Sequence, residues 1–385
     1  MNIKTLLFIA FSLQLSYSNA ASSWSQLANF GAEARHRGAG LVIGNKVYMG
    51  LGHYNGTGVN IIKNDWWQYD PGTNSWSQKA NYVGNNGIGN YAVLTFDMGN
   101  RGFLGGGQQG GSFSEFFEYV PSTNTWEGRT PSPTKPQNTY GFVIGNKGYY
   151  VATNQLREYN STTDTWTNKG TTPFTVNAWN SAFAIDGKGY IKINNSLWEY
   201  KPLTNQWVTR ANFPGLATAG SVSFTQNGKG YIVGGFGGSL SNVNSEVWEF
   251  NPATNTWQAL SNFLGTSRRF AVGLNLGNRA FLGTGTNGTN FNDFWEFDAL
   301  AELNDASKVD VVCYPNPAVQ KVQFKTEEHL GANLLIYNST GQLISNKRIE
   351  NKTEVFCREN NQAGVYFFFI KKDGQEVYSN KFIFQ

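Results

Sequence analysis

One stretch of the sequence recurs and decides the fold: Trp67-Gln68-Tyr69-Asp70-Pro71-Gly72-Thr73-Asn74-Ser75-Trp76. Its alternating aromatic residues are typical of a β-strand, its Pro and Asn of a tight turn, and its closing Trp of a second strand. Four further segments keep the spacing, with a Trp seven residues after a Tyr or Phe. The five pairs are Tyr69 and Trp76, Tyr119 and Trp126, Tyr159 and Trp166, Tyr200 and Trp207, and Phe250 and Trp257.

A second recurring element lies upstream, a basic residue followed two positions later by an aromatic residue. Its aromatic residues are Tyr48, Phe103, Tyr149, Tyr190, Tyr231 and Phe281. Together with an apolar strand in front, each unit of about 40 to 50 residues predicts four short strands, and helical periodicity is absent. Such units cannot cover their own apolar faces, so they must stack, and radial stacking gives a β-propeller.

The number of blades follows from a missing strand. A sixth aromatic segment, Phe294 to Asp298, should be followed by Trp at position 304, where the sequence has Asn304. Near the N-terminus, Ser23-Trp24-Ser25-Gln26 matches Ser75-Trp76-Ser77-Gln78. We therefore expect six blades, in which the N-terminal strand completes the last blade and removes an exposed sheet edge.

These repeats resemble the kelch family, whose blades carry Gly-Gly after the second strand and a paired Tyr and Trp further on. Gly-Gly occurs at Gly105-Gly106 and Gly234-Gly235, and the resemblance extends over residues 22–300. It implies an all-β fold, a kelch-type β-propeller, which we place at residues 21–304. Five Glu of the third strands (Glu118, Glu158, Glu199, Glu249 and Glu296) recur in step with the basic residues of the second strands. We interpret them as cross-strand partners rather than catalytic carboxylates.

Departures from the repeat indicate the binding face. The second and third aromatic strands are ten residues apart in blades 3 and 4 but 16 to 21 apart in the other four. Uneven loops predict an open-sided bowl, where we expect a glycan or protein ligand. Solvent-facing loop residues without a role are the alternative for each candidate. The candidate ligand-binding residues are Arg35, His36, Arg37, His53, Tyr54, Asp65, Trp66, Phe113, Trp179, Arg268 and Arg269.

Catalytic motifs are scarce. The propeller has no Cys, which excludes the cross-linked Tyr and Cys of kelch-like copper-radical oxidases. We expect no metal, no cofactor and no catalytic residue. Kelch-like sugar epimerases use Arg, Glu and His on the axial face, so Arg35, His36 and Arg37 leave an epimerase or mutarotase-like enzyme as the alternative. The net charge of +4 is too small and scattered to indicate nucleic acid.

The N-terminus has the pattern of an export signal. Lys4, an apolar run over residues 6–15 and the small residues before Ala21 predict a signal peptide at residues 1–20. No apolar run reaches the length of about 20 residues that a membrane span needs, so we expect no integral span in the mature protein. An oxidising compartment permits a disulfide between Cys313 and Cys357, and two buried free thiols are the alternative.

Composition changes near residue 304, after which no Trp occurs. Residues 305–385 show alternating apolar residues and an Asp373-Gly374 turn, which predict a small antiparallel β-sandwich. They resemble the C-terminal sorting domain of type IX secretion, with its Tyr-Pro-Asn-Pro opening. The residues that match its motifs are Tyr314, Pro315, Asn316, Pro317, Gly341, Gly364 and Tyr366. The resemblance implies that residues 305–385 engage the type IX machinery, and that the protein is secreted or attached to the outer cell surface.

Overall fold

The computed structural model describes residues 23–56, 58–176, 179–299, 311–339, 341–358, 361–372 and 375–385. The chain divides into two compact units, Met1–Ala299 and Leu300–Gln385. The expected signal peptide and the boundary at residue 304 lie outside the described residues. Among the described residues, no helix is long and apolar enough to cross a membrane.

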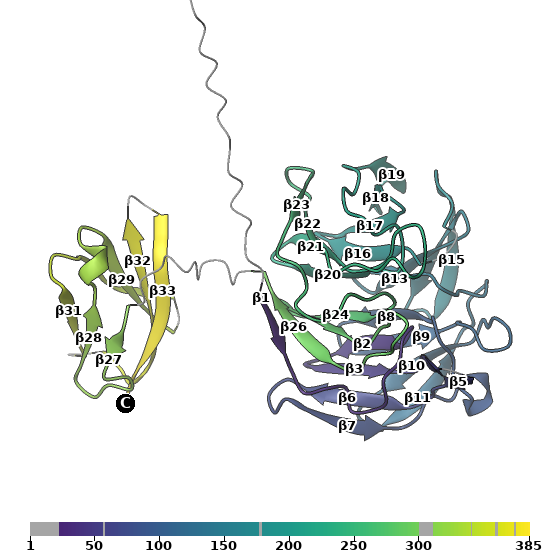
Figure 1. Ribbon diagram of the computed structural model, residues 1–385, viewed down its shortest axis with the longest axis horizontal. Coiled ribbons are helices and arrows are strands. Elements are labelled where there is room, and N and C mark those ends of the chain that lie inside the picture. Colours follow the sequence, from purple (N-terminus) through teal and green to yellow (C-terminus); the bar gives the residue numbers. More distant parts are fainter. Residues whose placement is uncertain are drawn as a thin grey trace, which may run out of the picture. The chain divides into compact units, whose positions relative to one another are not determined.

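The described part of the first unit contains six four-stranded antiparallel sheets (Figure 1). Their innermost strands contact one another in sequence, and the last contacts the first, so the sheets form a closed ring. We number the sheets as blades 1 to 6 and give their strands from the axis outward. Blade 1 contains β2 (Ala39–Ile43), β3 (Lys46–Gly50), β6 (Trp66–Asp70) and β7 (Ser75–Lys79); blade 2 contains β8 (Leu94–Met98), β9 (Arg101–Gly105), β10 (Phe116–Val120) and β11 (Thr125–Arg129); and blade 3 contains β12 (Phe142–Ile144), β13 (Lys147–Ala152), β14 (Gln155–Asn160) and β15 (Thr165–Thr171). Blade 4 contains β16 (Ser181–Ile185), β17 (Lys188–Ile193), β18 (Ser196–Lys201) and β19 (Gln206–Thr209); blade 5 contains β20 (Val222–Gln226), β21 (Lys229–Val233), β22 (Val247–Asn251) and β23 (Thr256–Ala259); and blade 6 contains β24 (Val272–Leu276), β25 (Arg279–Gly283), β26 (Phe294–Asp298) and β1 (Ser23–Gln26).

The N-terminal strand completes the last sheet, as the sequence predicted. Strand β1 pairs antiparallel with β26, and Trp24 lies opposite Phe297. Trp24 is 5% exposed and packs in a core with Phe224 and Phe263. Ring closure therefore joins the two ends of the propeller sequence through both hydrogen bonds and apolar packing.

The recurring turn connects neighbouring blades, as the turn of blade 1 shows. Asn74 has a φ of 48°, a left-handed conformation that Asn tolerates better than most residues. Its side-chain oxygen accepts hydrogen bonds from the Tyr69 hydroxyl and from the amide of Ala28. The indole of Trp76 donates to the Ala28 carbonyl (3.1 Å). The fixed spacing of Tyr, Asn and Trp thus serves packing between blades.

The repeated Glu residues are held by ion pairs. Glu118, Glu158, Glu249 and Glu296 each pair with the basic residue of the neighbouring second strand. Glu199 differs, because it pairs with Arg210 rather than with Lys188. The interpretation as cross-strand partners is therefore right for four of the five residues.

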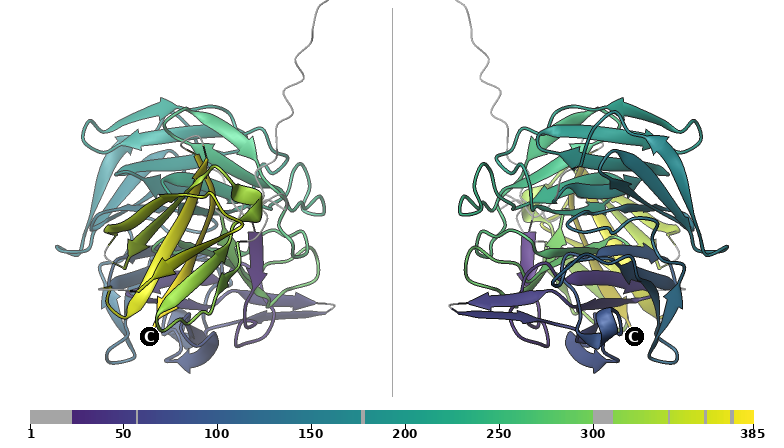
Figure 2. Two further views of the ribbon diagram at one scale, coloured as in Figure 1. Left: turned by 90° about the vertical axis from the view of Figure 1, so that its left-hand side faces the viewer. Right: turned by 90° about the vertical axis from the view of Figure 1, so that its right-hand side faces the viewer.

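Connections between the second and third strands differ in length as expected. Those of blades 3 and 4 contain two residues each, whereas the connection of blade 1 carries the hairpin β4 (His53–Gly56) and β5 (Val59–Ile62). Figure 2 shows this purple-blue hairpin extending beyond the rest of the unit. A short 3-10 turn, Asn85–Gly87, lies in the connection that follows blade 1. The uneven rim is thereby confirmed.

The second unit has two packed antiparallel sheets. One contains β27 (Cys313–Tyr314), β28 (Lys321–Lys325) and β31 (Thr353–Cys357), and the other β29 (Asn333–Asn338), β30 (Leu343–Arg348), β32 (Gly364–Lys372) and β33 (Gln375–Phe384). A 3-10 turn, Glu327–His329, precedes β29. The core includes Phe324, Phe368 and Phe382. Strands β32 and β33 form the expected hairpin, while Asp373 and Gly374 lie outside the described residues.

The motif at the start of this unit holds its last strand. The Asn316 side chain accepts a hydrogen bond from the amide of Ile383 (2.9 Å), and Ala318 bonds through its backbone to Ile383 and Gln385. Tyr366 is buried in the core, and Gly341 adopts a φ of 83° in a turn.

Cys313 is half-buried and Cys357 exposed, and both are free, so neither the disulfide nor the pair of buried thiols is present.

Candidate functional site

A ring of backbone hydrogen bonds surrounds the propeller axis where successive blades are joined. Its six residues are Arg37, Ala92, Asn138, Trp179, Gly220 and Phe270. Each amide donates to the carbonyl of the residue in the adjacent connection, over 2.5 to 3.1 Å, and the amide of Arg37 closes the ring on Phe270. All six have φ between 52° and 67°, a rare conformation for residues other than Gly. Their backbones are equivalent, but their side chains differ from blade to blade.

A hollow of about 450 Å³ lies at this ring. Its lining comes from connections of blades 1, 5 and 6, where the rim is tall. No acidic residue is among the lining residues, which are His36, Arg37, Asn55, Gly56, Leu240, Arg269, Phe270, Thr286 and Gly288. The hollow therefore carries two guanidinium groups without a carboxylate of its own.

Arg37 is held against aromatic faces. Its guanidinium carbon lies 4.1 Å from the ring centroid of Phe270 and 5.5 Å from that of Trp179. Its Nη1 lies 3.3 Å from His53 Nε2, and its Nε has no hydrogen-bond partner among the described residues. Burial lowers the pKa of Arg37, and the nearby charge of Arg269 lowers it further. An arginine nevertheless stays protonated near neutral pH, so the positive charge persists.

Arg269 faces the same hollow with fewer partners. Its Nε and Nη1 find no acceptor in the described part of the chain, and burial lowers the pKa of its guanidinium. Its guanidinium carbon lies 5.5 Å from the Phe270 ring centroid. Because buried N–H groups without acceptors are costly, this arrangement favours an anion at the hollow.

Two neutral histidines lie beside Arg37, and one of them, His53, contacts it. The rings of His36 and His53 are 4.1 Å apart, and burial lowers their pKa values to about 3 and about 4, with the charge of Arg37 contributing to both. His53 Nδ1 lies 3.1 Å from the Asn60 side-chain oxygen, so this nitrogen carries the proton. Its bare Nε2 then accepts from Arg37. His36 donates through Nε2 to Asn55, which leaves its buried Nδ1 without a partner among the described residues.

Three candidate residues belong instead to an arginine–aspartate ion pair that occurs twice in the propeller. Arg35 is 1% exposed and forms a two-pronged ion pair with Asp65, and Arg268 is 2% exposed and does the same with Asp293. In each pair the arginine also donates to a backbone carbonyl of the loop, Leu51 or Thr284. These three residues were selected as departures from the repeat, but the same arginine–aspartate pair occurs in two blades, where it holds two loops in place.

The remaining candidates are dispersed. Trp66 was expected to bind ligand at the uneven loops, but it is fully buried in β6, where it packs between Tyr48 and Trp126. Trp179 is a ring residue, and its indole donates to Asn138 (3.0 Å). Tyr54 is half-buried in the β4 and β5 hairpin, and Phe113 is half-buried between β9 and β10. Neither Tyr54 nor Phe113 lines the hollow.

Several residues of the site were not expected from the sequence. Asn55, Leu240, Phe270 and Thr286 line the hollow. Phe270 directly follows Arg269 in a connection between blades. A comparison of these connections with one another, rather than of the strands, would have identified it. Asp97, on the inner strand β8, was also not among the expected residues, and it lines a different cavity.

Comparisons with known proteins agree with this architecture. Residues 217–264 match the kelch motif, and residues 312–385 match the secretion system C-terminal sorting domain. A solved structure titled "Structure of YjhT" is similar over 70% of this chain and 95% of that one, with 16% identity and a TM-score of 0.59. At this identity the likeness concerns the fold alone. No match was found among curated proteins.

These matches confirm both resemblances stated from the sequence. The first unit is a kelch-type β-propeller, and the second is a sorting domain of type IX secretion. A protein with this domain is secreted or carried to the cell surface.

Proposed function

We propose that this exported kelch propeller is a recognition protein, and that its hollow binds an acidic sugar of an extracellular glycan. The supporting observation is the pairing of Arg37 and Arg269 at one hollow whose lining includes no carboxylate. Guanidinium groups bind carboxylates with particular strength, because two parallel N–H groups can meet two oxygens. A volume of about 450 Å³ falls within the range of small-ligand sites.

Aromatic surface beside the charges favours a sugar over a free inorganic anion. Phe270 is one of the lining residues, and Trp179 stands next to it, with ring centroids 5.3 Å apart. The apolar face of a sugar ring packs well on such side chains. Asn55 and Thr286 add polar groups for hydroxyl recognition.

An epimerase is less well supported than a binding protein. A general base works best when its pKa lies near the working pH. The pKa values of about 3 and about 4 make His36 and His53 weak bases, and both nitrogens of His53 already have partners. His53 is better suited to orienting Arg37, and His36 to packing against His53.

Calorimetric titration of the mature full-length protein tests the proposal, with glucuronate as the acidic probe and glucose as its neutral match. Glucuronate should bind saturably, and glucose at least tenfold more weakly. Arg37→Ala and Arg269→Ala should each weaken glucuronate binding at least tenfold. Alanine suits position 37, because Ala92 adopts the same left-handed conformation in the ring.

Lys201→Ala removes one positive charge from β18 and serves as the matched control. It should bind glucuronate as the parent does. If glucose binds as well as glucuronate, or if both arginine variants retain full affinity, the proposal is refuted. Turnover of either sugar to an isomer, followed by NMR, would favour the enzyme instead.

A further inference from the structure

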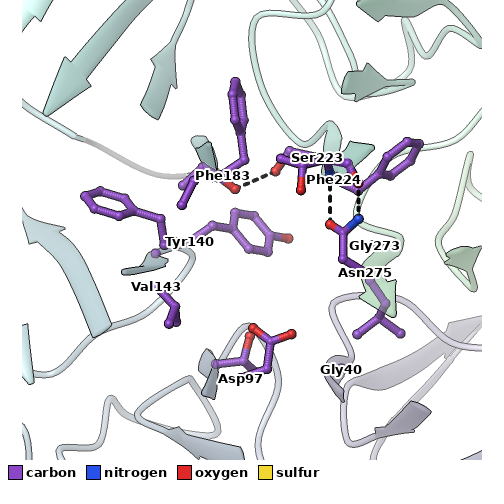
Figure 3. A pocket seen from close by; sticks show the side chains of 16 residues that line it. Gly40, Asp97, Tyr140, Val143, Phe183, Ser223, Phe224, Gly273 and Asn275 are labelled. Atoms are coloured by element: carbon purple, nitrogen blue, oxygen red, sulfur yellow. Dashed lines mark hydrogen bonds between the residues drawn. The ribbon is translucent and has the colours of Figure 1, made fainter. Parts of the chain in front are cut away.

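A second cavity, separate from the hollow, occupies the propeller axis. It has a volume of about 290 Å³ and is lined by residues of all six innermost strands (Figure 3). None of its lining residues lines the hollow. In Figure 3, the Asp97 carboxyl group and the Tyr140 hydroxyl group point toward the open centre. We refer to this cavity as the axial channel.

Asp97 is the one charged residue among those lining the axial channel. It lies opposite Gly102 in the pairing of β8 with β9. The same register places uncharged residues in the five other blades: Val42, Val143, Ala184, Thr225 and Asn275. Because five blades form without a carboxylate at this position, the fold does not require one.

The Asp97 carboxylate lacks a protein counter-ion. No Lys, Arg or His of the described residues forms an ion pair with it. Burial raises its pKa to about 6, although backbone hydrogen bonds at Asp97 and Val42 act in the opposite direction. Asp97 is half-buried at the channel wall. A partly desolvated charge without a counter-ion is costly, so its presence in one blade only favours a ligand that supplies the opposite charge.

The groups that face Asp97 are neutral acceptors and donors. From the other innermost strands and their connections, the lining includes Tyr140, whose hydroxyl points to the open centre, together with Ser223, Thr225 and Asn275. The Ser223 hydroxyl donates to the Ala182 carbonyl, and the Asn275 side-chain amide bonds the backbone of Thr225. Thr95 adds a hydroxyl group from the strand of Asp97 itself. Burial also raises the pKa of Tyr140, so this second titratable group stays uncharged at neutral pH.

We propose that the axial channel is a second ligand site, which takes a small molecule bearing a primary ammonium group with Asp97 as its counter-ion. An ammonium group has three N–H donors, which suit a carboxylate in a channel that is also lined by residues with hydroxyl groups. Calcium needs six to eight oxygen ligands and commonly several carboxylates, whereas this channel has one. The volume of about 290 Å³ restricts the ligand to a small amine.

Titration with ethanolamine at pH 8 tests the proposal on the mature full-length protein. Saturable binding is expected, and Asp97→Asn should weaken it at least tenfold. Blade 6 has an asparagine, Asn275, at the register position of Asp97. Asp97→Val is a second variant, because blades 1 and 3 have valine at this position, Val42 and Val143. The melting temperature of each variant verifies folding.

Two controls separate this site from the glucuronate site. Arg269→Ala should leave ethanolamine binding unchanged, and Asp97→Asn should leave glucuronate binding unchanged. Lowering the pH from 8 to 5 should weaken ethanolamine binding to the parent protein, because Asp97 becomes protonated. Undiminished binding by both Asp97 variants, absence of saturable binding, or saturable calcium binding that ethanolamine does not displace would overturn the proposal.

Discussion

Trp24 and Phe297 pack against each other across the junction of the first and last strands of the propeller. Their ring centroids are 4.9 Å apart, and their residues are partners in the pairing of β1 with β26. Trp24 also meets Phe263 edge to face at 4.7 Å. A residue near the N-terminus thereby belongs to the core of the last blade.

Trp24→Ala should lower the free energy of unfolding by about 3–5 kcal/mol, since it removes a buried indole and leaves a cavity at the junction. Chemical denaturation followed by Trp fluorescence measures the loss. Leu203→Ala, at a fully exposed side chain, is the control and should change stability by less than about 0.5 kcal/mol. A parent-like midpoint for Trp24→Ala would contradict closure through this strand.

Asp293→Asn should destabilise the protein by about 3 kcal/mol, because it leaves the buried guanidinium of Arg268 without its counter-ion. Arg268→Met combined with Asp293→Asn should recover part of the loss, since both charges are then absent. Thermal melting of the two single variants and the double variant measures the coupling. Purely additive effects would show that the pair does not act as a unit.

The two histidines should make the protein less stable in mild acid. Their pKa values in the fold, about 3 and about 4, lie below the unfolded value of about 6.5. The unfolded chain therefore binds more protons, and stability falls as the pH drops below about 6.5. His36→Gln, which keeps a donor toward Asn55, should flatten the decline of melting temperature between pH 7 and 5. An identical decline in parent and variant would rule out this origin.

Asp97 should act in the opposite direction. Its pKa of about 6 lies above the unfolded value near 3.8, so the folded state gains by protonation as the pH falls through 6. Asp97→Asn should therefore stabilise the protein at pH 8, by on the order of 1–2 kcal/mol after allowance for its partial exposure, and by less at pH 4.5. Lower stability of the variant at pH 8 would indicate a structural role for the carboxylate.

The sorting domain should be necessary for export. Deletion of residues 305–385 should leave the protein inside the cell envelope, because the matched sorting domain spans residues 312–385. Asn316→Ala is a finer test, since it removes the side-chain bond that holds β33 at Ile383. Immunoblots of medium and cell fractions measure the distribution. Normal secretion of the truncated chain would show that residues 305–385 do not direct export.

Repetition made the fold predictable from the sequence. The spacing of Tyr69, Asn74 and Trp76 is set within one turn, where Asn74 bonds the Tyr69 hydroxyl and Trp76 bonds the neighbouring blade. Every copy of the turn therefore keeps the same spacing. Trp24 was recognised as the missing strand for the same reason. The sorting domain was recognised from the order of its short motifs, beginning with Tyr-Pro-Asn-Pro, and the structure shows that Asn316 of this opening holds the final strand at Ile383.

The site was only partly predictable. His36, Arg37, His53 and Arg269 were among the expected residues, and the fold places them at or beside the hollow. Trp66 was misplaced because its position at the start of β6 buries it. Arg35 and Arg268 were taken for individual residues, because their ion pairs join segments far apart in the sequence.

The sequence by itself determined the all-β architecture, the closing strand and the sorting domain, because each depends on short-range spacing that repeats or follows a known order. The tertiary structure alone decided which charges remain without a partner. Arg35 and Arg37 are two residues apart, yet one is neutralised by Asp65 and the other faces the hollow. Arg37 belongs to the ring of left-handed residues around the axis, whereas Arg35 precedes that ring and pairs with Asp65.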